Sequence, residues 1–263
     1  MPTYSARMRG VKLNTTIPKT VLVTGAAGGI GKATVERLLK DGQRIVALDQ
    51  SYASLSAAFG DVTSHLQFSE GDVSRPDRCA AAVNTALEHF GGLDAVVHWA
   101  GIHSRGNWLD LTANEFNRVL AINVTGSFLV AQAAARYMTM HGGGSIVLCS
   151  STSMLVGTIG GDTGHGGAAY VASKSAIVGL VRSLARAVGP SGVRINGVVP
   201  GVTDTPMISS YSAEERKTQA ERCPLGRIGK PDDVVGAATF LISDDAKFVN
   251  GEMIIVNGGA IFG

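Results

Sequence analysis

Tyr170 and Lys174 are the two residues whose types and spacing most directly suggest chemistry. They lie four positions apart in the stretch 168–174, which reads A-A-Y-V-A-S-K. On a helix this spacing puts both side chains on one face, one turn apart. A free tyrosine has a pKa of about 10, too high for an efficient general base at neutral pH, and a nearby cation favours the tyrosinate. The pair therefore predicts a phenol that exchanges protons with a substrate, although the same spacing also occurs by chance in helices.

A glycine-rich turn near the N-terminus has the composition of a phosphate-binding loop. Residues 20–23 read T-V-L-V, a buried strand, and lead directly into T-G-A-A-G-G-I-G at 24–31. A helical pattern follows, and then a second strand, 44–49, that ends in an acid. The glycines let a pyrophosphate approach the backbone, and the helix N-terminus offers N–H donors. This order of strand, glycine turn, helix, strand and acid predicts a dinucleotide-binding βαβ unit.

Asp49, the acid that closes the second strand, bears on which dinucleotide binds. A carboxylate at this position accepts hydrogen bonds from the ribose hydroxyls of NAD and repels the 2′-phosphate of NADP. No Arg or Lys stands beside Asp49, and Gly28 occupies a place where a cation could have met that phosphate. The cofactor is therefore predicted to be NAD. The alternative is that Asp49 merely caps the next helix, 51–59.

Composition limits the classes of protein to which the chain can belong. Of its 263 residues, 45% are hydrophobic and 17% charged, which is enough apolar material for a sizeable core. The formal net charge is +2 and the basic residues are scattered, so nothing indicates a nucleic-acid-binding surface. No apolar run approaches the length of a membrane span. The widely spaced Cys79, Cys149 and Cys223 favour a reducing, cytoplasmic location and argue against a disulfide framework or a cysteine-based metal site.

Strand-sized apolar runs alternate with helical periodicity over the whole chain. This alternation predicts an α/β protein, a doubly wound (Rossmann-like) fold with a seven-stranded parallel sheet flanked by helices. Residues 1–18 are basic and contain no acid, and we interpret them as an N-terminal extension before a single domain at 19–263. The expected strands are 20–23, 44–49, 65–68, 93–98, 144–151, 192–199 and 252–256. The principal expected helices are 76–90, 168–189 and 231–243, together with the long apolar stretch 115–140, which can form one helix or two consecutive ones.

Several motifs, in order along the chain, resemble those of the short-chain dehydrogenase/reductase family from about residue 20 to the C-terminus. They are T-G-x-x-x-G-I-G at 24–31, D-V at 72–73, A-G at 100–101, I-N-V at 122–124, C-S-S-T at 149–152, Y-x-x-x-K at 170–174 and P-G at 200–201. The resemblance implies a catalytic set of Asn123, Ser151, Tyr170 and Lys174. The cofactor-binding residues that it implies are Gly25, Gly28, Gly29, Ile30, Gly31, Asp49, Asp72, Val73, Ala100, Gly101, Tyr170, Lys174, Pro200, Gly201, Val202 and Thr205.

The first departure from the family pattern is at 98–101. The chain reads His98-Trp99-Ala100-Gly101 where the family often has N-N-A-G. In the family the first two positions help to hold the central strand. We therefore interpret His98 and Trp99 as a packing variation without a chemical role, with His98 a satisfied histidine of the core.

The second departure is a glycine-rich insert at 157–167, which makes the segment between the implied catalytic serine and tyrosine longer than is usual in the family. The extra length leaves Ser150 and Ser153 as alternatives to the implied serine. The insert also holds Asp162 and His165, which are too few to indicate a metal site, and no metal is expected.

The resemblance also implies a mechanism. Tyr170 takes the substrate hydroxyl proton as general base while hydride leaves for NAD, and the roles reverse in reduction. Ser151 stabilises the charge that develops on the substrate oxygen. Lys174 lowers the pKa of Tyr170 and binds the nicotinamide ribose, and Asn123 helps to hold a water of the proton relay.

The sequence leaves the substrate open. The pocket is expected to be lined by residues after Gly101, by the insert at 157–167 and by the segment 203–226. The candidate pocket residues are therefore His103, Trp108, Met154, Met207 and Tyr211, a mixture that suits cyclic alcohols, sugars and hydroxyacyl groups about equally. The alternatives to an NAD-dependent secondary-alcohol dehydrogenase are a 3-oxoacyl-thioester reductase, a sugar dehydrogenase and a non-catalytic NAD-binding scaffold. We also expect a homotetramer, by resemblance to the family, and a partner that is a small molecule rather than a nucleic acid or a membrane.

Overall fold

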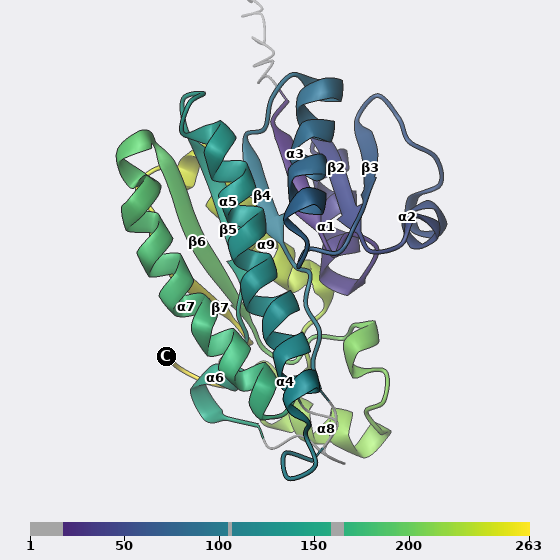
Figure 1. Ribbon diagram of the computed structural model, residues 1–263. Coiled ribbons are helices and arrows are strands. Elements are labelled where there is room, and N and C mark those ends of the chain that lie inside the picture. Colours follow the sequence, from purple (N-terminus) through teal and green to yellow (C-terminus); the bar gives the residue numbers. More distant parts are fainter. Residues whose placement is uncertain (1–17, 105–106, 159–165) are drawn as a thin grey trace, which may run out of the picture.

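The computed structural model describes residues 18–104, 107–158 and 166–263, and a single parallel sheet forms its centre (Figure 1). The sheet has seven strands in the order β3-β2-β1-β4-β5-β6-β7. Every neighbouring pair is parallel, so all carboxyl ends lie at one edge. The predicted α/β, doubly wound fold is confirmed. The strands are β1 (Thr20–Thr24), β2 (Arg44–Asp49), β3 (Leu66–Glu70), β4 (Ala95–His98), β5 (Gly144–Cys149), β6 (Val193–Pro200) and β7 (Met253–Val256).

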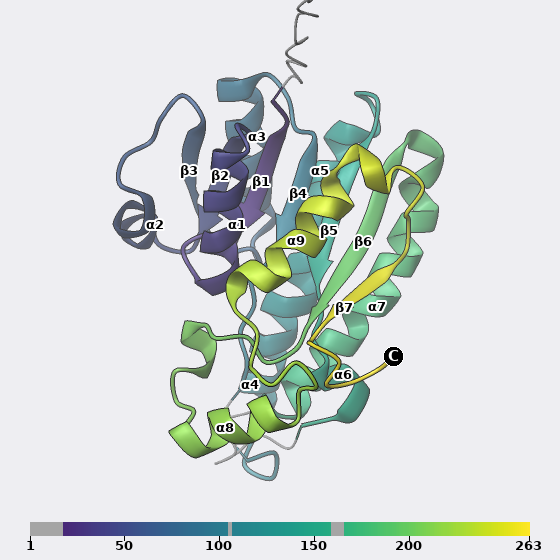
Figure 2. The ribbon, with the colours of Figure 1, turned by 180° about the vertical axis from the view of Figure 1, so that it is seen from behind.

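Helices cover both faces of the sheet, as the two opposite views show (Figures 1 and 2). One face carries α3 (Pro76–Phe90), α5 (Gly126–Met138) and α7 (Ala168–Val188), and the other carries α1 (Gly29–Lys40) and α9 (Pro231–Ile242). The shorter helical segments are α2 (Tyr52–Phe59), α4 (Ala113–Leu120), η1 (Ala121–Thr125), α6 (Ser153–Val156), η3 (Gly189–Ser191), η4 (Pro206–Ile208), α8 (Ala213–Glu221) and η5 (Asp244–Ala246).

Successive side chains of each strand enter two different cores, because neighbouring residues of a strand point to opposite faces. In β1, Leu22 packs in the core beneath α3, α5 and α7, whereas Val21 and Val23 pack beneath α1 and α9. Both faces are buried, which explains why the strands read as continuous apolar runs rather than as alternating ones.

The long apolar stretch expected at 115–140 folds as three helical segments that follow one another without a break. A π-helical turn, η1, joins α4 to α5. By length and composition alone, the resulting helix Ala113–Met138 could cross a membrane, which the sequence analysis did not anticipate. In this structure 44% of its most apolar window is buried inside the protein. Its apolar residues contribute to the core that α3 and α7 share with the sheet.

Two helices near the carboxyl edge of the sheet, α6 and α8, were not predicted. The sequence of α8, A-E-E-R-K-T-Q-A-E, has no apolar stripe, and none of its residues is buried. Its local signal is a capping box, in which the Ser212 hydroxyl accepts from the Glu215 N–H and the Glu215 carboxylate accepts from the Ser212 N–H. The predicted end of β5 also differs, because the strand stops at Cys149 rather than at Ser151.

The order of the strands fixes where a ligand can enter. β1 lies between β2 and β4, and the chain winds outward from this point in opposite directions. The helices that follow β1 and β4 therefore leave on opposite faces and open a crevice at the carboxyl ends of these strands.

Candidate active site

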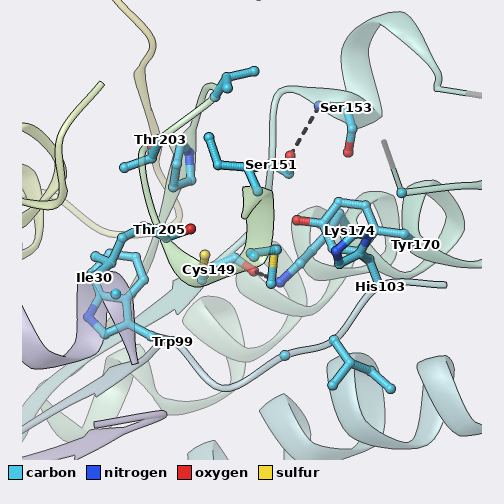
Figure 3. A pocket seen from close by; sticks show the side chains of 18 of the residues that line it. Ile30, Trp99, His103, Cys149, Ser151, Ser153, Tyr170, Lys174, Thr203 and Thr205 are labelled. Atoms are coloured by element: carbon cyan, nitrogen blue, oxygen red, sulfur yellow. Dashed lines mark hydrogen bonds between the residues drawn. The ribbon is translucent and has the colours of Figure 1, made fainter. Parts of the chain in front are cut away.

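A cavity of about 1390 Å³ lies at the carboxyl edge of the sheet (Figure 3). Its walls come from the ends of β1, β2, β4, β5 and β6 and from α7 and α8. Every residue predicted to bind the cofactor lines this one cavity, namely Gly25, Gly28, Gly29, Ile30, Gly31, Asp49, Asp72, Val73, Ala100, Gly101, Tyr170, Lys174, Pro200, Gly201, Val202 and Thr205.

The glycine turn after β1 is required by close backbone packing at two of its positions. Gly25 has a φ of 63°, and a Cβ there would lie 2.8 Å from the Ala100 nitrogen. A Cβ on Gly31 would overlap the Gly25 carbonyl oxygen. Gly28 is different, because the nearest atom to a Cβ there would be 3.8 Å away. Gly25 and Gly31 thus shape the turn, while Gly28 leaves space beside it.

The N-terminus of α1 is open toward this space. Among the described residues, no side chain caps α1 and none of the acids lies in its first turn. By contrast, Ser51, Thr112 and Ser212 cap α2, α4 and α8 through their hydroxyls. Uncapped N–H groups and the positive end of the helix dipole favour an anion. The turn therefore fits the pyrophosphate of a dinucleotide.

The carboxylate of Asp49 is held at the end of β2 by two backbone groups. Its Oδ2 accepts a hydrogen bond from the Ala27 N–H at 3.0 Å, and its Oδ1 accepts from the Gln50 N–H at 2.8 Å. A carboxylate has about four acceptor positions, so two remain for the hydroxyls of a ribose. Ser51, not Asp49, caps α2, which removes the alternative explanation for this acid.

Tyr170 and Lys174 occupy one side of the cavity, on the first two turns of α7 (Figure 3). The Lys174 Nζ lies 5.7 Å from the centroid of the Tyr170 ring and donates to the Cys149 carbonyl at 2.9 Å. Burial raises the pKa of Tyr170, while the Lys174 cation and a hydrogen bond from Ser151 lower it. The net shift is upward. The Lys174 cation acts in the expected direction, but the pKa of the phenol is raised rather than lowered, because burial dominates.

The surroundings of the three neighbouring serines distinguish them. Ser150 is 1% exposed and donates to the Lys174 carbonyl at 2.7 Å, so its hydroxyl is engaged within the protein. Ser151 accepts from the Ser153 N–H at 3.2 Å, and its hydroxyl lowers the pKa of the Tyr170 phenol. The Ser153 hydroxyl lines the cavity but has no hydrogen-bond partner among the described residues. Of the three serines, Ser151 is the one that acts on the pKa of Tyr170.

Asn123 lies behind the cavity in η1 and is completely buried. Its Oδ1 accepts from the Ile102 N–H at 2.8 Å, and its Nδ2 donates to the Ile102 carbonyl at 2.8 Å and to the Ser173 hydroxyl at 2.9 Å. This pairing ties the segment after β4 to α7 directly behind Lys174. Gly101 lies between the two side chains, since a Cβ there would be 3.2 Å from the Asn123 Oδ1 and 3.4 Å from the Lys174 Nζ.

The five residues predicted to contact the substrate divide into two groups. His103, Met207 and Tyr211 line the cavity, and the His103 ring packs edge-on against Tyr170 with centroids 6.0 Å apart. Burial raises the pKa of Tyr211 to about 12, with further contributions from Glu215 and Tyr170. Trp108 and Met154 are not part of the cavity lining, which corrects the prediction for them. The Trp108 side chain is 61% exposed, and the Met154 sulfur instead lies 3.2 Å from the Ser150 hydroxyl oxygen.

The segment 203–226, which was expected to line the cavity, does so in part through α8, although no helix was predicted there. The cavity-lining residues of α8 and its C-terminal end share one face of the helix; they are Glu214, Glu215, Thr218, Gln219 and Arg222.

Trp99 was also missed, since it was interpreted as packing alone. It lines the cavity beside Ile30 and Thr205 (Figure 3). His98 is buried at 1% exposure, as expected, and burial lowers its pKa to about 3. Only its Nδ1 is satisfied, because the Nε2 has no partner among the described residues.

The glycine-rich insert is described only at its ends, since residues 159–165, including Asp162 and His165, lie outside the described part of the chain. Gly157, Thr158 and Gly166 all line the cavity. Elsewhere in the described ranges, no three His, Cys, Asp or Glu side chains gather in a way that could hold a metal ion.

Comparison with known proteins identifies the family. A family model described as enoyl-(acyl carrier protein) reductase matches residues 25–260. An L-rhamnose 1-dehydrogenase (NAD(P)(+)) of Azotobacter vinelandii is 37% identical and a 3alpha-hydroxysteroid dehydrogenase of Mediterraneibacter gnavus 34% identical, each match covering 92% of this chain and 96% of the relative. A short-chain glucose/ribitol dehydrogenase structure from Brucella melitensis has a TM-score of 0.85 at 32% identity, covering 93% of this chain and 97% of that one.

These relatives are dehydrogenases, and the motifs that carry the similarity converge on one cavity. The chain is accordingly an oxidoreductase that acts on alcohol and ketone groups and uses a nicotinamide cofactor. It belongs to the short-chain dehydrogenase/reductase family.

Proposed function

We propose that the protein is an NAD-dependent dehydrogenase of ring-bearing secondary alcohols, with Tyr170 as its general acid and base. The observation that carries the proposal is the contact set at the start of α7. The Tyr170 phenol, the Ser151 hydroxyl and the Lys174 ammonium meet in the same cavity as the open end of α1. A proton-exchanging group and a site for a dinucleotide thus share one space.

In alcohol oxidation, the Tyr170 phenolate takes the proton of the substrate hydroxyl while the carbinol C–H bond breaks. Bound NAD⁺ supplies the acceptor for the hydride, so the alcohol loses two electrons and becomes a ketone. Ser151 donates a hydrogen bond to the substrate oxygen and stabilises the charge that develops on it. The Lys174 cation favours the phenolate, and Asn123 holds the segment after β4 against α7. In ketone reduction the proton moves in the opposite direction.

The preference for NAD rests on Asp49. Its carboxylate lies at the C-terminal end of β2 and is oriented by two backbone N–H groups. The negative charge of this carboxylate would repel the 2′-phosphate of NADP. The cations that line the cavity in the described chain, Lys174, Arg118 and Arg222, lie on other elements, α7, α4 and the end of α8. The same carboxylate argues against the alternative of a 3-oxoacyl-thioester reductase, whose family members usually take NADPH.

The nature of the alcohol is supported by both the cavity and the relatives. Rhamnose and hydroxysteroids, the substrates in the names of two relatives, are ring compounds that carry secondary hydroxyl groups. The cavity combines the apolar Met207 and Ile208 with the polar face of α8. A cavity lined by both polar and apolar side chains suits a ring with several hydroxyl groups, so a sugar is the second candidate within the same reaction class.

The test is NADH formation with a panel of cyclic secondary alcohols, in wild type and Tyr170→Phe. We expect the substitution to lower kcat by at least about a hundredfold, since it removes the proton-transfer group and leaves the ring in place. Its NADH affinity should stay close to that of wild type. A variant that kept most of the wild-type rate would remove Tyr170 from the mechanism. A wild type that bound NADH but oxidised no alcohol and reduced no ketone would instead support a non-catalytic scaffold.

We further propose a cytoplasmic homotetramer. The three cysteines are buried and free, in keeping with a reducing compartment. Apolar side chains are exposed near the β7 edge of the sheet, with Phe248 at 100% and Phe262 at 86%, and such surfaces are typical of contacts between subunits. Light scattering at micromolar concentration should give four times the mass of the chain, and a monomer would contradict the assembly.

A further inference from the structure

The pair His98-Trp99 at the end of β4 connects this strand to the phosphate-binding unit through side chains. The Thr24 hydroxyl oxygen accepts from the Ala100 N–H at 3.3 Å, and its distance to the His98 Nδ1 is 2.8 Å. Burial lowers the pKa of His98 to about 3, so the imidazole is neutral. The hydroxyl has one hydrogen and two lone pairs, so it can pair with Nδ1 in either tautomer of the neutral ring. The first residue of the pair is thereby fixed to the end of β1.

Trp99 makes the second connection, to α1. Its indole N–H donates to the Thr34 hydroxyl at 2.9 Å, and that hydroxyl donates in turn to the Ile30 carbonyl at 2.8 Å. The chain of donors runs in one direction, from the indole to the first turn of α1. Thr34 is completely buried, so a lost partner in this chain is not replaced by bulk water.

The indole ring itself faces the cavity. Trp99 lines it together with Ile30 and Thr205, on the side opposite Tyr170 and Lys174 (Figure 3). Thr205 lies against the glycine turn, since a Cβ on Gly29 would be 2.7 Å from its methyl carbon. The ring is thus placed next to the uncapped N–H groups of α1, where the dinucleotide would pass.

We propose that Trp99 is a positioning residue for the dinucleotide. It sets the first turn of α1 through Thr34, and its ring forms part of the wall against which the bound cofactor lies. The inference rests on the proposed function, because it assumes that a dinucleotide enters this cavity. Trp99 stands where the family often has an asparagine. The proposal gives this departure a role that a small polar side chain could not fill.

The experiment uses the two tryptophans as matched probes, since the chain has only Trp99 and Trp108. Trp99→Phe keeps an aromatic ring but removes the donor, and Thr34→Val removes the acceptor with little change in shape. Each should weaken NAD binding about twofold to tenfold, the range for one hydrogen bond. The combined loss in the double variant should be smaller than the product of the two single losses, because both substitutions remove the contact between Trp99 and Thr34. The kcat at saturating NAD should stay near the wild-type value.

Trp108→Phe provides the control, because Trp108 is exposed and outside the cavity lining. In that variant Trp99 is the only indole, and its emission should change when NAD⁺ is added, whereas the emission of Trp108 in Trp99→Phe should not. If Trp99 acted in folding alone, Trp99→Phe would have a lower Tm but the same NAD affinity as wild type. The emission of Trp99 in Trp108→Phe would then not change when NAD⁺ is added.

The outcomes separate this inference from the function on which it rests. Additive losses in the double variant, or unchanged NAD affinity in Trp99→Phe, would overturn the role of Trp99. If neither the wild type nor the Trp108→Phe control bound any dinucleotide, the proposed function itself would be overturned.

Discussion

The two ends of the cavity are built in different ways. At the dinucleotide end, backbone makes much of the surface, through the turn at 25–31, Gly101 and the open N-terminus of α1, and the Asp49 carboxylate and the Trp99 ring complete it. At the substrate end, side chains make it, from α8, from η4 and from the segment after β4. Several of these side chains are half-buried or exposed, including Glu214 and Arg222.

This difference indicates which properties can change easily. A backbone turn in which a single added carbon would collide with a neighbour tolerates few substitutions. Side chains on a polar helix tolerate many, since they are not packed in a core. We therefore expect the dinucleotide end to govern stability and cofactor choice, and the substrate end to govern only the choice of alcohol.

Gly31→Ala should show the largest effect. The new Cβ would overlap the Gly25 carbonyl, so the turn must move, at a cost of about 3 kcal/mol of unfolding free energy or more. Gly28→Ala is the matched control, since its Cβ would have 3.8 Å of clearance. Thermal unfolding of both variants checks this. Equal Tm values would mean that the turn is not as rigid as its contacts indicate.

Asp49→Ala should change cofactor choice without changing substrate choice. Removing a charged acceptor of ribose hydroxyls should lower kcat/KM for NAD by about tenfold to a hundredfold, and NADP should lose its disadvantage. The KM for the alcohol should stay constant, because Asp49 lies at the other end of the cavity from α8. Equal use of both cofactors by the wild type would refute the NAD assignment.

Lys174→Met should move the pH profile of alcohol oxidation. Burial raises the pKa of Tyr170 and the Lys174 cation lowers it, so losing the cation must raise it further. Because oxidation needs the phenolate, the rate of the wild type should rise as the pH increases above neutral, and the variant should need a still higher pH. The measurement is kcat/KM as a function of pH in both enzymes. If the rising part of the profile did not move to higher pH in the variant, Lys174 would have no effect on the ionisation of Tyr170.

Met207→Ala should have the smallest effect and the most selective one. Met207 lines the substrate end, and loss of its apolar contact should change the KM for the alcohol by about threefold to tenfold. Met140→Ala, at a side chain that is 73% exposed, serves as control. NAD affinity should be unaltered in both variants. A parallel loss of NAD affinity in Met207→Ala would show that the two ends of the cavity are coupled.

Much of the dinucleotide end could be predicted from the sequence. The glycine turn, Asp49, Ala100-Gly101 and Pro200-Gly201 each lie at the end of a strand or just after it, and all of them line the cavity. Such motifs are local, and the carboxyl ends of parallel strands always meet at the same edge of a sheet. Local pattern and one topological rule were sufficient to bring them together.

The substrate end could be predicted only in part. His103, Met207 and Tyr211 line the cavity, but Trp108 and Met154 do not. A loop or a short helix such as α6 can turn its side chains either way, and the outcome depends on packing with distant segments. The segment 203–226 was expected in the cavity wall, but the face of α8 that points into the cavity was not predicted, because nothing local distinguishes a helix face toward a cavity from one toward solvent.

The sequence by itself determined the α/β class of the fold, the glycine turn and the pairing of Tyr170 with Lys174, since each depends on periodicity or on spacing within one element. Only the tertiary structure decided that burial outweighs the lysine cation at Tyr170 and that Ser151, rather than Ser150, contacts it. The same holds for Trp99, whose indole reaches Thr34 across 65 positions. Desolvation and contacts between distant residues depend on what surrounds a side chain in space, and spacing along the chain does not contain that information.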